Sequence, residues 1–447
     1  MNKFKIGFVS LGKQYGFNLD LAGETRKKSI DLLESIDDLS VVTAGDLVIT
    51  ENDAQNAIEK FKNNNVDQVI IQSGTFSSGE VFMKFAKSFD GPFLLWGIPE
   101  PKIEENIKLN SLCGVNLNSS LLSNLDKEYK YIYGNPTEEK INNELVSWFK
   151  VNSLKEDLKD LNVGLFGSHT PGFYTFGINE LKLRKNVGPR ITHVDLSKLY
   201  QKAESHKGED TSDFDSELSE LSDNYDELPK NKQSQYSRTY KSFKDIIDEF
   251  SLDAVAVKCW PEFIEDYGQA ACATLSKLTN DDIVTGCEGD VLGTVTSYIL
   301  SELGDSAPFI ADLVQIEKDK NTGVMWHCGV APFCHAHSES PVKIGEEFGI
   351  GGINVEFAMQ PGEVTIARLS MNKGDYRLLI TSGEAVDTTE TPDGTAAVVK
   401  FDSDINEVLD TIIYGGYEHH LSLVYADVKK ELIELGKLLD IETVVLE

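Results

Sequence analysis

The feature that most constrains the fold is an alternation of short apolar runs with stretches of helical spacing. In the first third of the chain, strand-like runs occupy residues 5–10, 39–42, 47–50, 66–72 and 93–96, and helical spacing occupies residues 24–36 and 52–63. Strands separated by helices of this length form βαβ units, which build a parallel sheet. We therefore predict an N-terminal α/β domain with a parallel sheet over residues 1–155.

The same alternation resumes in the middle of the chain. A strand that ends in glycine is predicted at residues 163–167, a helix at 240–250 and another strand at 254–257. The segment 204–227 is rich in Ser, Asp and Glu and poor in apolar residues, which predicts a solvated loop or a weak helix. These elements predict a second α/β domain with a parallel sheet over residues 156–307.

Closely spaced short strands replace this alternation from about Pro308 onward. Period-two patterns with Gly and Pro turns between them predict strands at residues 354–358, 363–369 and 376–380. A helix at residues 424–439 and a strand at 443–446 are predicted to close the chain. The predicted fold class is thus two α/β domains with parallel sheets, followed by a C-terminal antiparallel β barrel or sandwich over residues 308–447.

Composition argues against several classes of partner. The 447 residues include 73 Asp and Glu against 42 Lys and Arg, which gives a formal net charge of -31. Such a surface repels nucleic acid and anionic membranes. No apolar run is long enough to span a bilayer, and the N-terminal run is too short for a signal-peptide core. The six cysteines form no CxxC pair, so we expect reduced thiols, a cytoplasmic location, and neither nucleic acid nor membrane as a partner.

Three places along the chain combine carboxylate or imidazole groups with the end of an element. Glu288 and Asp290 lie at a predicted strand-to-helix junction, where a carboxylate is often only a helix cap. Asp312 directly follows an apolar run and, taken alone, is more often a turn or cap residue. His419 and His420 follow a glycine turn and lead into the helix predicted near the C-terminus.

Two carboxylates and an imidazole suit a divalent cation. Oxygen ligands favour hard cations such as Mg²⁺, and an imidazole shifts the preference toward Mn²⁺. His327, Cys328, His335 and His337 lie within a short interval and suggest zinc as an alternative. Their spacing fits no common closed zinc site.

Read together, these places resemble the L-fucose/L-arabinose isomerase family in their order along the chain. The motifs are Lys258-Cys259-Trp260-Pro261, Cys287-Glu288-Gly289-Asp290, Asp312, Gly415-Gly416 followed by His419-His420, Gly74-Thr75-Phe76-Ser77, and the stretches 348–352 and 375–379. The resemblance therefore extends over nearly the whole chain.

The resemblance implies a metal-dependent aldose–ketose isomerase of a monosaccharide, with a divalent metal, above all Mn²⁺, as cofactor. Glu288 and Asp312 would be metal ligands and also the acid–base pair of an enediol mechanism. His420, or alternatively His419, would be the third ligand. Substrate contacts would come from Gln14, Thr75, Phe76, Trp260 and His327. The family also implies a homo-oligomer, a hexamer rather than a tetramer, in which the first domain of one subunit helps cover the site of another.

The subfamily and the sugar stay open at this point. Asp312 matches the fucose branch, whereas His327 and Glu347 lie near the places of two further metal ligands of the arabinose branch. Fucose, arabinose, their stereoisomers and a sugar with an anionic group, such as a 6-modified aldose, are all compatible. Arg368, Lys373 and Arg377 could meet such an anion or be surface charges on strands.

Other interpretations of the same residues also stay open. Trp260 and Phe76 could be core residues rather than sugar contacts. A metal-assisted lyase or epimerase would use the same acids and metal. A non-catalytic sugar-binding regulator is the alternative from a different class of function.

Overall fold

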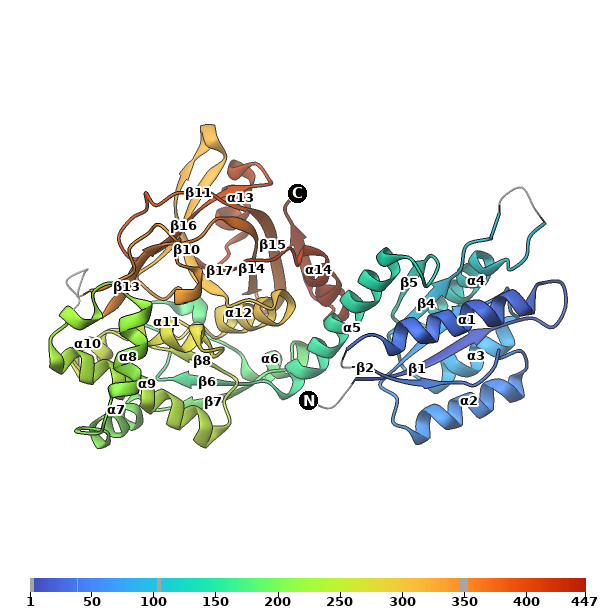
Figure 1. Cartoon of the computed structure of the whole chain (residues 1–447), viewed down its shortest axis with the longest axis horizontal. Helices are drawn as coiled ribbons and strands as arrows, with labels where there is room; N and C mark the ends of the chain where they lie inside the picture. Colours follow the sequence, from blue (N-terminus) through green and yellow to red (C-terminus); the bar gives the residue numbers. More distant parts are fainter. Residues whose placement is uncertain (1–3, 38, 103–105, 346–352) are drawn as a thin grey trace. The chain divides into compact units, whose positions relative to one another are not determined.

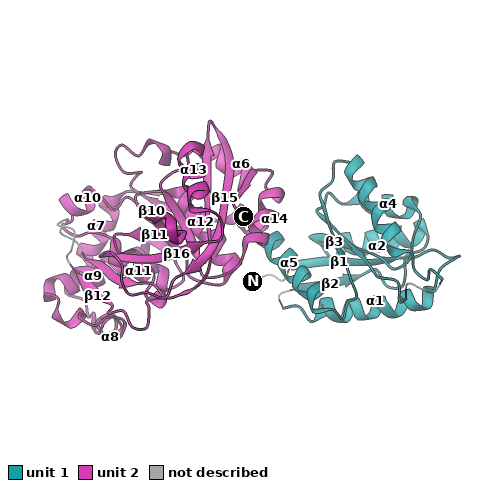
Figure 2. Cartoon of the chain, turned by 90° about the horizontal axis from the view of Figure 1, so that it is seen from above, with its two compact units in different colours: residues 1–153 teal, residues 154–447 magenta. Residues whose placement is uncertain are grey.

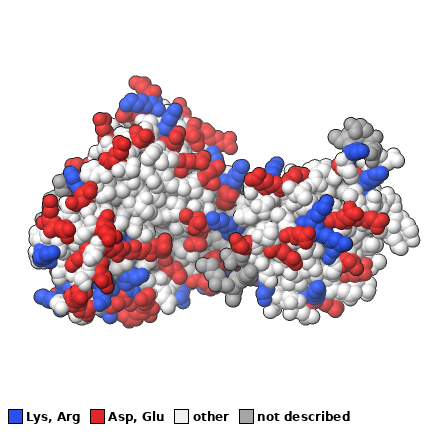
Figure 3. Space-filling view, viewed as in Figure 1, with Lys and Arg blue, Asp and Glu red and all other residues white. Residues whose placement is uncertain are grey.

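The computed structural model describes residues 4–37, 39–102, 106–345 and 353–447. The chain forms two compact units, residues 1–153 and residues 154–447 (Figure 2). Acidic side chains are spread over the visible face of both units, with Lys and Arg between them (Figure 3). Among the described residues, we find no helix with the length and apolar character needed to cross a bilayer.

The first unit is built around a parallel sheet of strands in the order β2-β1-β3-β4-β5 (Figure 1). Its strands are β1 (Phe4–Leu11), β2 (Leu39–Thr43), β3 (Gln68–Ser73), β4 (Phe93–Gly97) and β5 (Tyr129–Tyr133), and its helices are α1 (Leu19–Glu34), α2 (Glu51–Asn63), α3 (Gly79–Ser88), α4 (Ser111–Asn124) and α5 (Glu139–Asp160), the last of which continues past residue 153. The strand predicted at 47–50 is reduced to an isolated bridge between Leu11 and Val48.

Alternation along β1 explains why helices cover both faces of this sheet. Ile6 and Phe8 point into a core shared with α1 and α5, whereas Val9 and Leu11 point into a core shared with α2, α3 and α4. A strand that is buried on both faces reads as a continuous apolar run, as this one does. The predicted parallel α/β domain is confirmed.

The second unit begins with a parallel sheet in the order β7-β6-β8-β9. Its elements are β6 (Asn162–Phe166), α6 (Glu180–Asn186), β7 (Arg190–Val194), α7 (Leu196–Ser205), α8 (Ser212–Leu221), α9 (Lys230–Phe250), β8 (Ala254–Val257), α10 (Glu262–Glu265), α11 (Cys272–Asn280), β9 (Val284–Gly286) and α12 (Val291–Gly304). The acidic segment 204–227 contains α8, and its Leu218 and Tyr225 are buried in the core. The weak-helix alternative is therefore the correct one, although the segment also contributes to packing.

A closed antiparallel barrel follows within the same unit. The barrel strands are β10 (Phe309–Glu317), β11 (Thr322–His327), β14 (Gly362–Asn372), β15 (Asp375–Ala385), β16 (Thr395–Phe401) and β17 (His420–Val424), with β12 (Lys343–Gly345), β13 (Asn354–Ala358) and β18 (Glu442–Val445) added at its margins. Pairing of β15 with β16 closes the ring. The predicted fold class is confirmed. The separation of residues 156–307 from 308–447 as domains stays a prediction.

The C-terminal region differs from its prediction in one respect. Residues predicted as one helix divide into the end of β17, which includes Val424, and helix α14 (Lys429–Leu438), whereas α13 (Ile405–Gly415) precedes them. His420 thus begins a strand and not a helix. A short buried apolar run such as residues 420–424 has the same signature in a strand as in a buried helix.

Helix α12 connects the sheet to the barrel. It contacts β8 and β9 on the sheet and β14 and β17 on the barrel. Its buried residues extend around its circumference, which is the pattern of a helix enclosed by other elements. The carboxyl ends of β8 and β9 are thereby brought next to barrel strands, and this is where the candidate site lies.

Candidate active site

The loop between β9 and α12 holds Glu288 in a left-handed backbone conformation. The φ angles of Glu288 and Gly289 are 61° and 72°, a region that side chains other than glycine rarely occupy. The Gly289 N–H donates to the Val257 carbonyl at 2.9 Å, and the Glu288 carbonyl accepts from the Thr170 N–H at 3.1 Å. Such strained residues concentrate at functional sites. Backbone contacts thus fix the point from which the Glu288 side chain projects.

Glycine at position 289 is required by a close approach. A Cβ atom there would lie 2.3 Å from the Ser168 carbonyl oxygen. The positive φ and the neighbouring backbone both exclude a side chain.

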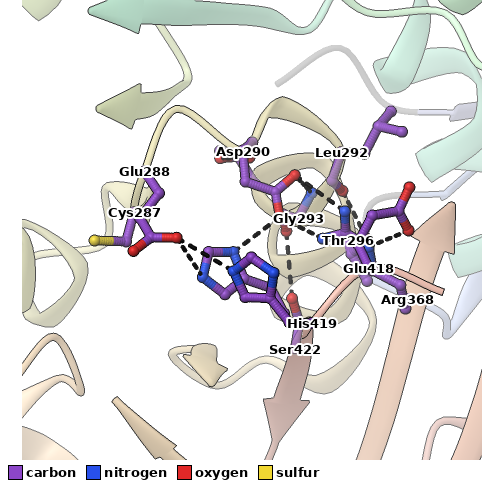
Figure 4. Close-up of polar contacts among 12 residues, drawn as sticks. Cys287, Glu288, Asp290, Leu292, Gly293, Thr296, Arg368, Glu418, His419 and Ser422 are labelled. Carbon is purple, nitrogen blue, oxygen red and sulfur yellow. Dashed lines mark hydrogen bonds and ion pairs between the residues drawn. The ribbon is translucent and has the colours of Figure 1, made fainter. Parts of the chain in front are cut away.

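Asp290, two residues later, has a different task from Glu288. Its carboxylate accepts from the Gly293 N–H at 2.9 Å and so caps α12. The same carboxylate forms an ion pair with Arg368 (Figure 4). It also accepts from His420 Nδ1 at 3.0 Å, so Asp290 links α12 to barrel strands β14 and β17. The helix-cap interpretation is therefore correct for Asp290.

Arg368 is fully buried between two carboxylates. In addition to its ion pair with Asp290, Arg368 donates a hydrogen bond from Nε to the Glu418 carboxylate at 3.3 Å. Arg377 is also buried, donates to the Gly416 carbonyl at 2.9 Å, and packs against the Tyr417 ring. Of the two interpretations left open for Arg368 and Arg377, that of surface charges is wrong, because both side chains are buried and engaged by internal partners, whereas Lys373 is exposed.

The imidazole of His420 is oriented by this network. Its side chain is 1% exposed, and with Nδ1 directed at Asp290, its Nε2 lies 3.5 Å from Glu288 Oε2 and 4.0 Å from Asp312 Oδ1. Nε2 has no hydrogen-bond partner in the described parts of the chain. Burial lowers the pKa of His420, although the hydrogen bond to Asp290 opposes this. The Nε2 atom of an imidazole oriented by Asp290 therefore faces two carboxylates.

Glu288 accepts hydrogen bonds from two rings. The Trp260 indole N–H donates to Oε1 at 3.1 Å, and His419 Nε2 lies 3.2 Å from Oε2. Burial alone would raise the pKa of Glu288, but the contacts with His419, His420, His327 and Trp260 hold it below its ordinary value. Burial lowers the pKa of His419, whereas its hydrogen bond to the Glu288 carboxylate raises it. The net effect is a pKa above the ordinary value. Trp260 is 39% exposed, so its interpretation as a core residue is wrong.

Asp312 and His327 approach the same place from the barrel. Asp312 lies within β10 and pairs with Trp326 on β11 and with His420 on β17. The turn or cap interpretation of Asp312 is therefore wrong. Asp312 Oδ1 and His327 Nε2 are buried, and neither has a hydrogen-bond partner among the residues that the structure describes.

A cavity of about 450 Å³ joins these side chains. Trp260, Glu288, Asp312 and His327 are among its lining residues. Burial opposes protonation of His327, but the neighbouring Cys328 together with Asp312 and Glu288 raises its pKa to about 10. The cavity therefore combines carboxylates, an aromatic surface and a histidine that favours the charged form. Its volume is adequate for a monosaccharide.

The site contains one group of potential metal ligands. Ligand atoms of Glu288, His419 and His420 all lie within 4.8 Å of one another, and this is the single group of three or more that the described residues form. The zinc alternative based on His327, Cys328, His335 and His337 therefore finds no support in the described structure.

The remaining predicted contacts lie in the first unit. Gln14, Thr75 and Phe76 follow the carboxyl ends of β1 and β3, where the Lys13 N–H donates to Thr75 Oγ1 at 2.9 Å. Gln14 is exposed, Phe76 is half-buried, and Thr75 is buried. Residues 348–352 and Glu347, which contributed to the family resemblance or its alternatives, lie outside the described residues.

Sequence reasoning did not identify the Asp290–Arg368–Glu418 network. Two signals were available: an arginine in the middle of a strand whose residues 364–370 are otherwise uncharged, and a glutamate directly before the histidine pair. Fully buried charged residues are almost always paired, so a buried arginine predicts a nearby carboxylate. The sequence alone does not say which carboxylate.

Comparison with known proteins decides the family. The domain family described as fucose/sulfoquinovose isomerase, N-terminal domain, matches residues 7–159, and the L-fucose isomerase C-terminal domain matches residues 325–447. A sulfoquinovose isomerase of Priestia aryabhattai is 33% identical over 99% of this chain and 99% of its own length. The chain belongs to the fucose/sulfoquinovose isomerase family. A sulfoquinovose isomerase of Alkalicoccus urumqiensis is 31% identical over 96% of this chain and 97% of that protein.

Membership in this family establishes the reaction class. The chain is an enzyme of the aldose–ketose isomerase type. The family resemblance inferred from the ordered motifs is confirmed, and the matched C-terminal domain belongs to the fucose branch.

Proposed function

We propose that the chain is a metal-dependent isomerase that converts a 6-sulfonated aldose, sulfoquinovose or a close analogue, into the corresponding ketose. The proposal rests on one observation. A chain that aligns end to end with proteins named sulfoquinovose isomerase places Glu288, Asp312 and His327 on the wall of a cavity of monosaccharide size, with His419 and His420 beside Glu288. Sulfoquinovose carries a sulfonate at C6, which leaves C1 and C2 free for the isomerisation.

The donor set fits a divalent metal. The atoms His420 Nε2 and Asp312 Oδ1 are buried, lack hydrogen-bond partners among the described residues, and lie 4.0 Å apart, with Glu288 Oε2 at 3.5 Å from the same nitrogen. Buried polar groups without partners are costly, so a bound cation would satisfy them. We propose Glu288, Asp312 and His420 as ligands, with His419 as the alternative to His420, and Mn²⁺ as the metal.

A bound divalent cation would polarise the substrate oxygens on C1 and C2. The chain supplies the proton transfers. Glu288 is held as a carboxylate by its neighbours and is suited to take the C2 proton, whereas Asp312, which lines the same cavity, would exchange a proton with the oxygen that changes between carbonyl and hydroxyl. The resulting enediol collapses to the ketose when the proton returns to C1. Trp260 both orients Glu288 and offers an apolar ring to the sugar.

The decisive experiment is a ketose-formation assay with sulfoquinovose, L-fucose, L-arabinose and unsubstituted D-glucose, each with Mn²⁺ and with EDTA. We expect turnover of the sulfonated sugar, its loss with EDTA, and its recovery with Mn²⁺. Product analysis by NMR separates a ketose from the products of a lyase or epimerase. Turnover that is insensitive to EDTA would refute the metal, and preference for L-fucose would refute the substrate.

A matched pair of variants tests the role of Glu288. Both Glu288 and Glu265 line the cavity, but only Glu288 is hydrogen-bonded by Trp260 and His419. We expect Glu288→Gln to lower turnover by at least about 10²-fold, with Glu265→Gln close to wild type. Equal effects in the two variants would remove Glu288 from the acid–base step.

The quaternary structure is a further part of the proposal. We propose a homo-oligomer, a hexamer rather than a tetramer, in a cytoplasmic setting, with Gln14 and Phe76 of one subunit contacting the sugar in another and the buried Thr75 supporting their loops through its hydrogen bonds. Light scattering coupled to gel filtration measures the assembly. Mixing Gln14→Ala and Glu288→Gln protomers would restore part of the activity if the contact acts between subunits.

A further inference from the structure

Four of the six cysteines converge beside the cavity from four separate segments. Cys259 follows β8, Cys287 follows β9, Cys272 begins α11, and Cys328 follows β11. All four are reduced, and three of them, Cys259, Cys272 and Cys328, line the cavity. The other two cysteines, Cys113 and Cys334, are exposed.

Two pairs of thiols are in contact, and the Cys328 thiol also interacts with that of Cys287. The sulfur atoms of Cys259 and Cys287 are 3.1 Å apart, and those of Cys272 and Cys328 are 3.4 Å apart. The single group of metal ligands found among the described residues contains no cysteine. This arrangement therefore suits chemistry between two sulfur atoms better than a thiolate cage around a metal.

Each pair lies next to residues of the proposed active site in the chain. Cys259 precedes Trp260, Cys287 precedes Glu288, and Cys328 follows His327. A change of covalent structure in the cluster is therefore transmitted directly to side chains that line the cavity.

Cys328 is the thiol best placed to react first. It is the one member of the cluster that is not fully buried. His327 Nδ1 lies 3.2 Å from its sulfur. An imidazole within hydrogen-bond distance of a thiol promotes the thiolate, which is the reactive form. The sulfur of Cys272 is then in position to act as the second thiol.

We propose that Cys272 and Cys328 form a redox-sensitive pair that peroxide converts to a disulfide, which reversibly inactivates the enzyme. The Cys328 thiolate attacks one oxygen of hydrogen peroxide and the O–O bond breaks, leaving a sulfenic acid on Cys328 and hydroxide. The Cys272 sulfur then attacks the sulfenic sulfur, forms the S–S bond and releases the sulfenic oxygen as water. In total, two thiols are oxidised, one peroxide is reduced, and two waters form.

Closure of this disulfide moves the wall of the cavity. The two sulfur atoms must approach from 3.4 Å to about 2.0 Å. Cys328 draws its neighbour His327 with it, and a misplacement of about 1 Å in an active site can cost about a hundredfold in rate. The bond itself is independent of the proposed function, whereas its effect on turnover rests on that function.

The test treats the purified full-length protein with hydrogen peroxide, blocks remaining thiols with iodoacetamide, and maps peptides by mass spectrometry without reduction. We expect a Cys272–Cys328 linked peptide that dithiothreitol removes. Turnover should fall about a hundredfold and recover on reduction. Cys272→Ser should lose the link and accumulate sulfinic acid on Cys328, whereas the control Cys334→Ser should behave as wild type.

Several outcomes would overturn the assignment. One is oxidation that is confined to Cys113 and Cys334. Another is a Cys259–Cys287 disulfide that forms without a Cys272–Cys328 disulfide. Because the wild-type peptide map requires no substitution, a variant that fails to fold does not remove the test. A Cys272–Cys328 link that leaves turnover unchanged would overturn the regulatory part alone, and a link in a protein inactive on every sugar would count against the proposed function alone.

Discussion

The ion network behind His420 makes a quantitative prediction for Arg368→Met. Arg368 is fully buried, and it compensates both Asp290, which is 0% exposed, and Glu418, which is 5% exposed. Methionine retains the apolar stem and removes the charge. Removal of one partner from a buried ion pair costs about 3–5 kcal/mol. Because two carboxylates lose their cation here, we expect the free energy of unfolding to fall by an amount near the upper end of that range.

The loss should depend on pH in a defined direction. In the wild type, burial would raise the pKa of Asp290, but Arg368 and His420 hold it well below its ordinary value. Without Arg368, burial raises this pKa above that of the unfolded chain, and the native state then binds more protons. Stability of the variant should therefore fall as pH rises from 5 to 8, because the native carboxyl group loses its proton.

Urea unfolding followed by circular dichroism measures both effects. The control is Arg377→Met, which also removes a buried guanidinium from the barrel, but one that donates to the Gly416 carbonyl and packs 3.7 Å from the centre of the Tyr417 ring. We expect about 1–2 kcal/mol for the control. An Arg368→Met cost no larger than the control at pH 8, or no recovery toward pH 5, would refute the coupling of these charges.

Three further substitutions test the site and its surroundings. Gly289→Ala should destabilise the protein by at least about 1–2 kcal/mol from the positive φ alone, measured by urea unfolding, and should weaken Mn²⁺ binding because Glu288 is displaced. Asp290→Asn still caps α12 but no longer fixes His420 through a carboxylate, so calorimetry should show Mn²⁺ affinity about 10–100-fold lower; unchanged affinity would remove Asp290 as a positioning residue. Burial lowers the pKa of His335, although a hydrogen bond to the Ala307 carbonyl opposes this. As pH falls, the histidine is therefore protonated at a higher pH in the unfolded chain than in the native protein, and wild-type stability falls as pH drops through about 6.5. His335→Gln should reduce that slope in thermal unfolding at pH 7 and pH 5, and an identical slope would contradict the assignment.

The parallel sheets were predictable because their strands are buried on both faces. Runs such as β1, β4 and β8 consist mostly of apolar residues, and polar or glycine-containing turns separate them from helices. This signal is local and does not depend on tertiary contacts. The strand β17 lacked this signal. Its short apolar run is followed closely by a helix, and the two form one continuous hydrophobic pattern in the sequence. Only pairing with β10 and β14 decides that residues 420–424 are extended.

The order of the site motifs could also be predicted, but not their geometry. Glu288, Asp312 and His420 come from a loop and two barrel strands that are far apart in the sequence, and the register of β10 with β17 is what sets Asp312 opposite His420. One residue of slip would turn one of these side chains to the other face of the barrel. No local pattern in either strand specifies that register.

The two carboxylates of the Glu288-Gly289-Asp290 segment show most clearly where sequence reasoning ends. Both are acids near a helix start, so the sequence allows each of them to be either a helix cap or a carboxylate of the active site. The backbone separates the tasks: a left-handed φ at Glu288 directs its side chain to the cavity, whereas the extended φ of -76° at Asp290 directs its side chain to the first turn of α12. Asp290 then orients His420, so the cap and the proposed ligand site are parts of one arrangement. A single substitution at Gly289 should therefore disturb both the helix start and the site, and this joint loss distinguishes the arrangement from two independent features.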